Sequence, residues 1–255
     1  MADSATPSGQ SPYVSAPHIS VIIPAFNETG RLGATLESIA GYFSRRGTPV
    51  EIIVVDDGST DRTAELAVAF SKTAPEIRVI SYPHNRGKGY AVKFGMANAR
   101  GSLLLFDDAD GATPIEEIVR LEAAIAAGAE VAIGSRAKPS SETAVQALWY
   151  RKLIGRTFNL IVNTLIVPDI LDTQCGFKLF TRAAADRIFP RQTSERFSFD
   201  VEILFLARKS GFSIAEVPVN WHNVPGSKVN LAVDSMAMLF DIFRFRWNYL
   251  CGCYD

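Results

Sequence analysis

Short apolar runs alternate with amphipathic stretches along the first 136 residues of the chain. Each run lacks the polar alternation of a half-exposed strand, which is typical of parallel strands buried on both faces. The pattern predicts strands at 19–25, 51–55, 77–82, 102–106 and 130–135. We expect Pro24 to end the first strand, because proline cannot donate to a ladder.

The stretches between these runs carry apolar residues at helical spacing, as Leu32, Leu36, Ile39 and Phe43 illustrate in the first of them. Helices are predicted at about 31–46, 60–72, 84–99 and 114–127. Strands and helices that alternate with short connections favour an α/β fold with a doubly wound, mostly parallel sheet.

Beyond residue 136 the chain predicts a long amphipathic helix at 145–167, which packs on the core or lies at a membrane interface. Gly176 marks a turn, helices follow at 182–188 and 199–210, and a last strand at 212–219. The helix at 231–250 has more apolar surface than one packing face needs. It packs on the domain, lies at a membrane interface or binds a partner.

Composition sets the limits of these interpretations. A chain of 255 residues, 47% hydrophobic and 21% charged, can form one large domain, expected at 18–230 between a disordered tail (1–17) and the amphipathic helix region (231–255). The net charge of −1 gives no reason to expect nucleic acid as a partner. Three cysteines without a CxxC pair argue against structural zinc and suit a reducing compartment. We find no signal peptide or apolar membrane-spanning run.

The run at 102–106 ends in Asp107, Asp108 and Asp110, three carboxylates within four residues. Ligands bind at the carboxyl ends of strands in open α/β sheets. Carboxylates this close repel one another, so they need hydrogen bonds, protons or a cation. Mg²⁺ and Mn²⁺ are often held by one or two carboxylates together with substrate phosphates. The alternative is a solvated loop that caps the next helix.

Polar residues also follow the earlier strands. Asn27 and Glu28 either cap a helix or contact a ligand, and Asp56 either forms an Asx-turn or binds a ribose or base. The sequence His-Asn-Arg-Gly-Lys-Gly at 84–89 places glycines and cations at a helix start, as an anion site would. Its spacing differs from that of a Walker motif, and no GxGxxG follows the first strand.

In order and spacing, these motifs resemble the family-2 glycosyltransferases of GT-A fold, over roughly residues 18–240. Within that family the chain looks most like the dolichyl-phosphate β-glucosyltransferases, a branch that loads sugars onto polyprenyl phosphates. The matching segments are IIPAFNE (22–28), VVDDGSTD (54–61), NRGKG (85–89), DDADGAT (107–113), IGSR (133–136), DTQCGFKLF (172–180), VNWH (219–222) and GSK (226–228).

The resemblance implies a GT-A domain whose nucleotide-binding half precedes an acceptor half. It implies Mg²⁺ or Mn²⁺ as cofactor, bound by the DxD pair Asp108 and Asp110. The expected nucleotide-sugar site consists of Pro24, Ala25, Asn27, Glu28, Asp56, Lys88, Asp108 and Ala109. Where the mannosyl branch often has a metal-binding Gln, this chain has Ala112, which leaves three alternatives: a water in that place, Thr113, or a different coordination.

The expected catalytic groups are Asp110, Lys178 over the donor phosphates, and Arg136, which with Arg151 would hold the acceptor phosphate. An acceptor hydroxyl needs a carboxylate base, whereas an acceptor phosphate is already an anion. The region after Asp110 has no clear Glu-Asp base motif, and the loop after Arg136 is basic. Both features favour a phosphate acceptor. Because no protein-bound glycosyl intermediate is required, we expect inversion at the sugar carbon.

The expected partners are a nucleotide-sugar, most simply UDP-glucose, a polyprenyl or dolichyl phosphate, and a membrane surface. The protein would then lie in the cytoplasm, peripherally bound to the cytosolic face of a membrane. Three alternatives share the donor motifs: a GDP-mannose-dependent transferase of the same branch, a family-2 enzyme with a hydroxyl acceptor, and an inactive nucleotide-binding scaffold.

Overall fold

A computed structural model describes residues 17–138, 140–146, 166–224 and 231–254. A seven-stranded sheet runs through it in the order β3-β2-β1-β4-β7-β5-β8. All neighbouring strands are parallel except at β7, which is antiparallel to both β4 and β5. The strands are β1 (Ile19–Ala25), β2 (Val50–Asp56), β3 (Ile77–Ser81), β4 (Leu103–Asp107), β5 (Val131–Ser135), β7 (Phe177–Thr181) and β8 (Ile214–Pro218).

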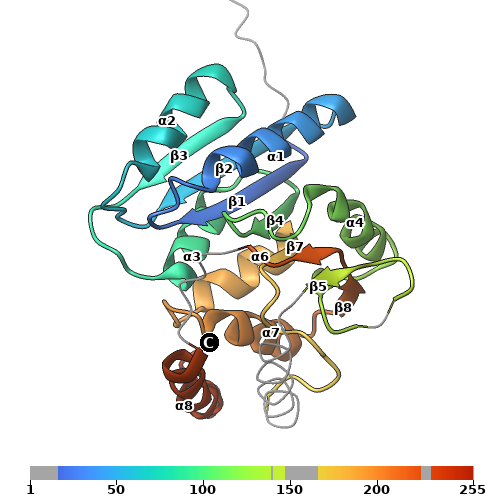
Figure 1. Ribbon diagram of the computed structural model, residues 1–255. Coiled ribbons are helices and arrows are strands. Elements are labelled where there is room, and N and C mark those ends of the chain that lie inside the picture. The colour runs from blue at the N-terminus through green and yellow to red at the C-terminus, as the bar shows by residue number, and fades with distance from the viewer. Residues whose placement is uncertain (1–16, 139, 147–165, 225–230, 255) are drawn as a thin grey trace, which may run out of the picture.

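Helices cover both faces of the sheet, so the domain has three layers (Figure 1). One face carries α1 (Leu32–Arg46), α2 (Thr63–Thr73), the 3₁₀ turn η1 (Ile115–Glu117) and α4 (Ile118–Ala126). The other carries α3 (Lys88–Asn98), α6 (Arg182–Ile188), η2 (Phe189–Arg191), α7 (Phe199–Lys209) and α8 (Leu231–Leu250). The prediction of a doubly wound, mostly parallel sheet is confirmed.

The uninterrupted apolar runs follow from this layering. In β1, Val21 and Ile23 pack toward α1, while Ile22 packs toward α3 on the opposite face. All three side chains are fully buried. A strand covered on both sides needs apolar residues at every position, which is why these strands show no alternation.

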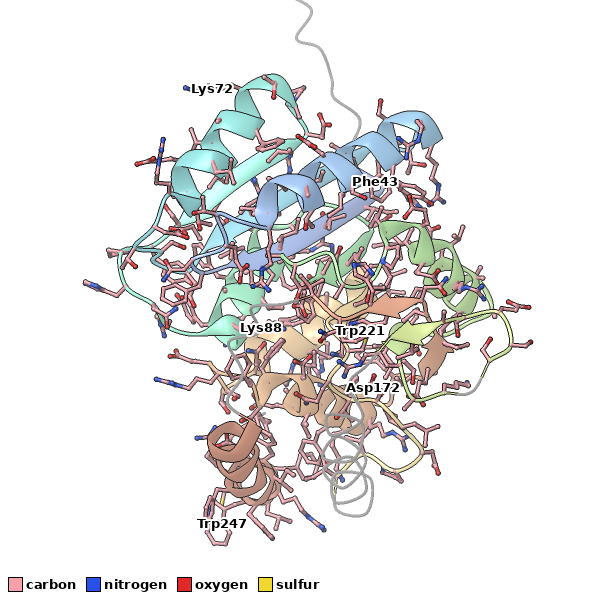
Figure 2. All side chains as sticks on the ribbon, in the orientation of Figure 1. Phe43, Lys72, Lys88, Asp172, Trp221 and Trp247 are labelled. Atoms are coloured by element: carbon pink, nitrogen blue, oxygen red, sulfur yellow. The ribbon has the colours of Figure 1, made fainter. Side chains whose placement is uncertain are left out.

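Over residues 240–250, whose side chains the structure describes, helix α8 packs on the domain along one side. Ile242 and Phe245 are 1% and 0% exposed and belong to the core beneath α7. Phe240, Phe243, Trp247 and Leu250 are 64–78% exposed and follow one another at helical spacing. We call these four residues the apolar stripe. Figure 2 shows Trp247 directed away from the domain. None of the described helices is long and apolar enough to cross a bilayer.

Two predictions about the boundaries of elements were wrong. Pro24 lies within β1, in register with Val55 of β2, and does not end the strand. The pairing of β1 with β4 stops at Ile22, so the missing N–H interrupts no ladder on that side. The helix predicted at 145–167 cannot begin at 145, because β6 (Val145–Gln146) pairs with β9 (Trp221–His222).

The remainder of that helix, at 147–165, lies outside the described residues, as does nearly all of the tail predicted at 1–17. Strand β7 was not predicted. Its sequence begins immediately after Gly176, and the turn there is followed by a strand that lies between β4 and β5. The division of the chain at 18–230 and 231–255 stays a prediction.

Candidate active site

The acidic turn at the end of β4 is held in place from two sides. Asp107 is the last residue of β4 and is 2% exposed. The Thr35 hydroxyl of α1 donates to the Ala109 carbonyl at 2.9 Å, and the Ala112 amide donates to Asp110 Oδ1 at 3.1 Å. The side chains of Asp108 and Asp110 keep 34% and 26% of their surface exposed. The turn therefore directs two carboxylates outward and leaves Asp107 beneath them.

The carboxylates of this turn are not fully neutralised. Lys88 Nζ lies 2.7 Å from Asp108 Oδ1, while Arg31 Nη1 lies 3.9 Å from Asp110 Oδ2. Burial and then the neighbouring carboxylates raise the pKa of Asp107 well above its usual range. Burial and Asp108 also raise the pKa of Asp110. Such raised values indicate that another positive charge would be stabilised at the turn.

This donor set fits Mg²⁺ or Mn²⁺, because oxygen ligands from one or two carboxylates suit these ions when substrate phosphates complete the coordination. Among the described residues, no group of three Asp, Glu, His or Cys side chains is arranged as a ready-made metal centre. Asp108 and Asp110 could therefore bind an ion together with a ligand.

Gly176 lets the start of β7 approach Asp108 closely. The Asp108 amide donates to the Gly176 carbonyl at 3.2 Å. A Cβ on Gly176 would overlap the Asp108 carboxylate. The glycine is thus required by a close approach of the carboxylate, whereas the sequence had suggested only a turn.

The predicted nucleotide-binding residues lie at the carboxyl ends of β1 and β2. Asn27 adopts a left-handed backbone, and its Oδ1 accepts from the amides of Thr60 and Asp61 at 2.8 and 3.2 Å. It thereby fixes the loop after β2. Glu28 accepts two hydrogen bonds of 2.7 Å from the Arg31 guanidinium.

Pro24, Ala25 and Asp56 are buried or nearly so at the same edge. The Asp56 carboxylate accepts a 3.4 Å hydrogen bond from the Ser59 amide, as the Asx-turn alternative predicted. Because Ala25 is in register with Asp56, the two strand ends lie side by side.

The Gly-Lys-Gly turn before α3 is fixed by Asp57, a residue to which the sequence assigned no role. The Asp57 carboxylate accepts from the amides of Arg86 and Gly87 at 2.7 and 2.9 Å. Gly87 has a φ of 110°, which favours glycine. This geometry directs Lys88 to Asp108. The segments that follow β2, β3 and β4 therefore meet at this point.

Lys178 lies on β7 and is fully buried. Its ammonium donates to the Cys175 carbonyl at 2.6 Å and forms an ion pair with Asp200 of α7. Burial raises the pKa of Asp200, although Lys178 opposes that shift. The ammonium thus has two protein partners in this structure. The role expected for it over donor phosphates stays a prediction.

Arg136 follows β5 and forms a two-pronged ion pair with Asp172. Its Nε and Nη2 lie 2.6 and 2.8 Å from the two carboxylate oxygens. Burial would raise the pKa of Asp172, but Arg136 outweighs it and holds that pKa below its usual range. The guanidinium also lies 5.5 Å from the centre of the Trp221 ring. Trp221 and Asp172 are labelled in Figure 2.

The structure thus brings several of the predicted residues to one place: Lys88 contacts Asp108, Asp110 lies in the same turn, and Gly176 joins that turn to the start of β7. Arg151 lies outside the described residues. Sequence reasoning missed Arg31 and Asp200, since neither belongs to a strand-end motif. It placed Trp221 in a matching motif without a role, and the adjacent His222 amide donates to the Ala112 carbonyl at 3.0 Å.

Some known proteins are similar to this chain in sequence, and others are similar in fold. The Dictyostelium discoideum dolichyl-phosphate beta-glucosyltransferase is 41% identical over 247 residues, covering 92% of this chain and 76% of the relative. The human dolichyl-phosphate beta-glucosyltransferase is 37% identical over 249 residues, covering 92% and 77%.

Among solved structures, mannosyl-3-phosphoglycerate synthase from Rubrobacter xylanophilus superimposes with a TM-score of 0.68 at 18% identity, covering 93% of this chain and 75% of the other. Glucosyl-3-phosphoglycerate synthase from Mycobacterium tuberculosis, in complex with Mn²⁺, UDP-glucose and phosphoglyceric acid, gives 0.66 at 20% identity, with coverage of 89% and 79%. At these identities the likeness concerns the fold. The model for Glycosyl transferase family 2 matches residues 20–189. The chain belongs to this family.

Proposed function

We propose that this protein transfers glucose from UDP-glucose to a dolichyl or other polyprenyl phosphate and inverts the sugar carbon to give a β-linked product. The observation that supports it most is an incompletely neutralised pair, Asp108 and Asp110, beside Lys88. It occurs in a chain 41% identical to a dolichyl-phosphate beta-glucosyltransferase. The acidic pair suits a metal-bound diphosphate, and the relative suggests the acceptor.

Asp108 and Asp110 would hold Mg²⁺ or Mn²⁺ in the complex with the donor. The ion supplies positive charge to the diphosphate as the glycosidic bond breaks. Lys88 is bound to Asp108 and can add its charge on the same side. Asn27, Glu28 and Asp56 form the neighbouring edge, where the nucleoside of the donor would lie.

The acceptor phosphate needs no protein base, because it is already an anion at neutral pH. Its difficulty is to approach an anionic donor, which nearby cations ease. Arg136 is the described cation in the best place to do so, since 31% of its side chain is exposed although Asp172 binds it. Arg151 would act with Arg136. Lys178, whose ammonium is paired with Asp200, would add positive charge over the donor phosphates.

An assay of glucose transfer tests the proposed function. The protein is incubated with UDP-[¹⁴C]glucose, Mn²⁺ and a short polyprenyl phosphate, and radioactivity is counted in the organic phase. Parallel reactions replace the donor by GDP-[¹⁴C]mannose and the acceptor by the unphosphorylated polyprenol. Transfer that requires the phosphate supports the proposal. Preference for GDP-mannose or for the polyprenol would identify the corresponding alternative enzyme, and UDP binding by calorimetry without any turnover would favour the scaffold.

We also infer that the apolar stripe of α8 rests on the cytosolic face of a membrane, where the lipid acceptor would be. Phe243, Trp247 and Leu250 expose large apolar surface, and Arg244 and Arg246 lie beside them to attract anionic head groups. All three cysteines are free, which suits a cytosolic location.

Vesicle flotation tests this inference. Wild-type protein should float with vesicles that contain anionic lipids, and Trp247 fluorescence should shift to the blue. Trp247→Glu should prevent flotation, whereas Val119→Glu, on the exposed surface of α4, should not. Equal flotation of both variants would exclude the apolar stripe as the contact.

A further inference from the structure

A buried carboxylate on α7 organises the segment beside the Gly-Lys-Gly turn. Glu202 is 0% exposed. Its Oε1 accepts from the amide and hydroxyl of Thr193 at 2.9 and 2.6 Å, and its Oε2 accepts from the Ser194 amide at 2.7 Å. A fourth bond of 2.7 Å comes from the Tyr254 phenol. Since all of these described partners are neutral, the carboxylate depends on each bond to offset its desolvation.

The segment held by Glu202, residues 192–196, lies directly against the turn that carries Lys88. Glu195 O accepts from the Tyr90 amide at 3.1 Å, and Gln192 Nε2 donates to the Gly89 carbonyl at 2.8 Å. A Cβ on Gly87 would lie 2.5 Å from Glu195 O, and one on Gly89 would lie 2.6 Å from the Ser194 carbonyl. Contacts this close mean that a shift of the segment must move the turn.

Tyr254, just beyond α8, binds both Glu202 and Arg191, the residue that precedes segment 192–196. The side chain is 5% exposed, and its backbone carbonyl accepts from Arg191 Nε at 2.6 Å. Burial, followed by the Glu202 charge, raises the pKa of the Tyr254 phenol, so the hydroxyl remains a donor at neutral pH. Arg191 and Gln192 are adjacent, so one contacts Tyr254 while the next contacts Gly89.

We propose that Tyr254 is a positioning residue for the nucleotide-sugar site. It acts through Glu202 and segment 192–196 on the turn that directs Lys88 to Asp108, and it touches neither substrate. The inference rests on the proposed function, because that function places the donor at this turn. It also means that α8 and the donor site share one continuous set of hydrogen bonds, with Tyr254 at the end near α8.

The test compares Tyr254→Phe with Tyr249→Phe. Tyr254→Phe removes the hydroxyl and keeps the buried ring. Tyr249 is 42% exposed on α8, so Tyr249→Phe removes a hydroxyl without disturbing Glu202. In the transfer assay, Tyr254→Phe should raise KM for UDP-glucose at least about threefold, which is part of the roughly tenfold or more that a hydrogen bond to a charged group is worth, because the loss reaches the donor site only through segment 192–196. KM for the polyprenyl phosphate should stay within about twofold, because that site lies elsewhere.

A second measurement does not depend on turnover. Amide hydrogen exchange, followed by mass spectrometry, should be at least about threefold faster in peptides covering 86–91 and 193–196 of Tyr254→Phe. Peptides covering β2 should exchange as in wild type. If wild-type protein transfers no sugar, the proposed function fails. The exchange result would still decide whether Tyr254 acts through segment 192–196 on the turn that carries Lys88.

Unchanged exchange at 86–91 would overturn the proposal. So would uniformly faster exchange over the whole domain with equal changes in both KM values, since that is the result of general destabilisation. Tyr249→Phe should match wild type in both measurements, and a change there equal to that in Tyr254→Phe would also overturn it.

Discussion

At the end of β4, Asp107, Asp108 and Asp110 share one turn, with Lys88 bound to only one of them. Two other buried carboxylates each have their own cation: Asp172 pairs with Arg136, and Asp200 pairs with Lys178. The raised pKa values at the turn show that its charge is unfavourable in the free protein. Of the paired carboxylates, Asp172 has a pKa that Arg136 holds below its usual range, whereas burial raises the pKa of Asp200 although Lys178 opposes the shift. The comparison suggests that Asp108 and Asp110 are kept for ligand binding, whereas Asp172 and Asp200 hold the fold and Asp107 is structural.

The largest expected effect is on transfer by Asp110→Asn. Under the proposed function Asp110 is a metal ligand, and its loss would remove several kcal/mol of transition-state stabilisation, so kcat/KM should fall about 1000-fold. Stability should be unchanged or higher, because a repulsive charge is removed. Organic-phase counting and thermal unfolding measure the two effects.

Glu116→Gln is the matched control, because Glu116 is an exposed carboxylate on nearby η1. It should leave both quantities as in wild type. A large loss of stability in Asp110→Asn would break the comparison, since the carboxylate would then hold the fold.

Gly176→Ala should reduce kcat/KM about 100-fold, because the added Cβ displaces the Asp108 carboxylate and misplacement by about 1 Å has effects of that size. Gly30→Ala is the control, since a Cβ at Gly30 meets no atom within 4 Å. Near-normal activity of Gly176→Ala would show that the position of Asp108 is not critical.

Asp172→Asn should lower stability. Removing one partner of a buried ion pair costs about 3–5 kcal/mol, and the 31% exposure of Arg136 reduces this to about 2–3 kcal/mol. Glu142→Gln breaks the exposed Arg120 pair and should cost less than about 1 kcal/mol. Urea unfolding measures both. Equal losses of unfolding free energy would show that the Arg136–Asp172 pair holds the fold no more than an exposed ion pair does.

The smallest effect concerns pH. A carboxyl whose pKa is raised in the folded state stabilises the fold below its unfolded pKa, near 3.8, and that contribution is lost as pH rises through the folded pKa. In EDTA, the Tm of wild type should therefore fall relative to that of Asp110→Asn as the pH rises above about 4, by no more than about 2–4 °C. Mn²⁺ should reverse the difference. A difference independent of pH would contradict the direction of the Asp110 shift.

The first half of the fold could be predicted because its strands, turns and helices are consecutive in the sequence. Each strand is buried on both faces, so its apolar run is conspicuous, and each polar turn follows at once. The prediction that Asp108 and Asp110 lie at a strand end required only local pattern. The contact of Asp108 with Lys88 was not predicted, although both residues follow strands whose carboxyl ends share one edge of the sheet.

The second half depends on contacts between distant residues. Nothing around Lys178 indicates that its partner is Asp200, or that the strand carrying it lies between β4 and β5. The two-residue strand Val145–Gln146 is too short to leave a periodic signal, and its partner lies at Trp221–His222. Arg31 and Asp57 were missed because their roles depend on the positions of other turns.

The position of β7 has a consequence for the order of folding. A chain made from its N-terminus can pair β1 to β4 early, but β4 remains an open sheet edge until residues 177–181 are added. Pairings between such distant segments form slowly, and unpaired edges favour aggregation. The close approach of Gly176 to Asp108 arrives with the same strand. Completion of the acidic turn and closure of the aggregation-prone edge are therefore expected to occur together.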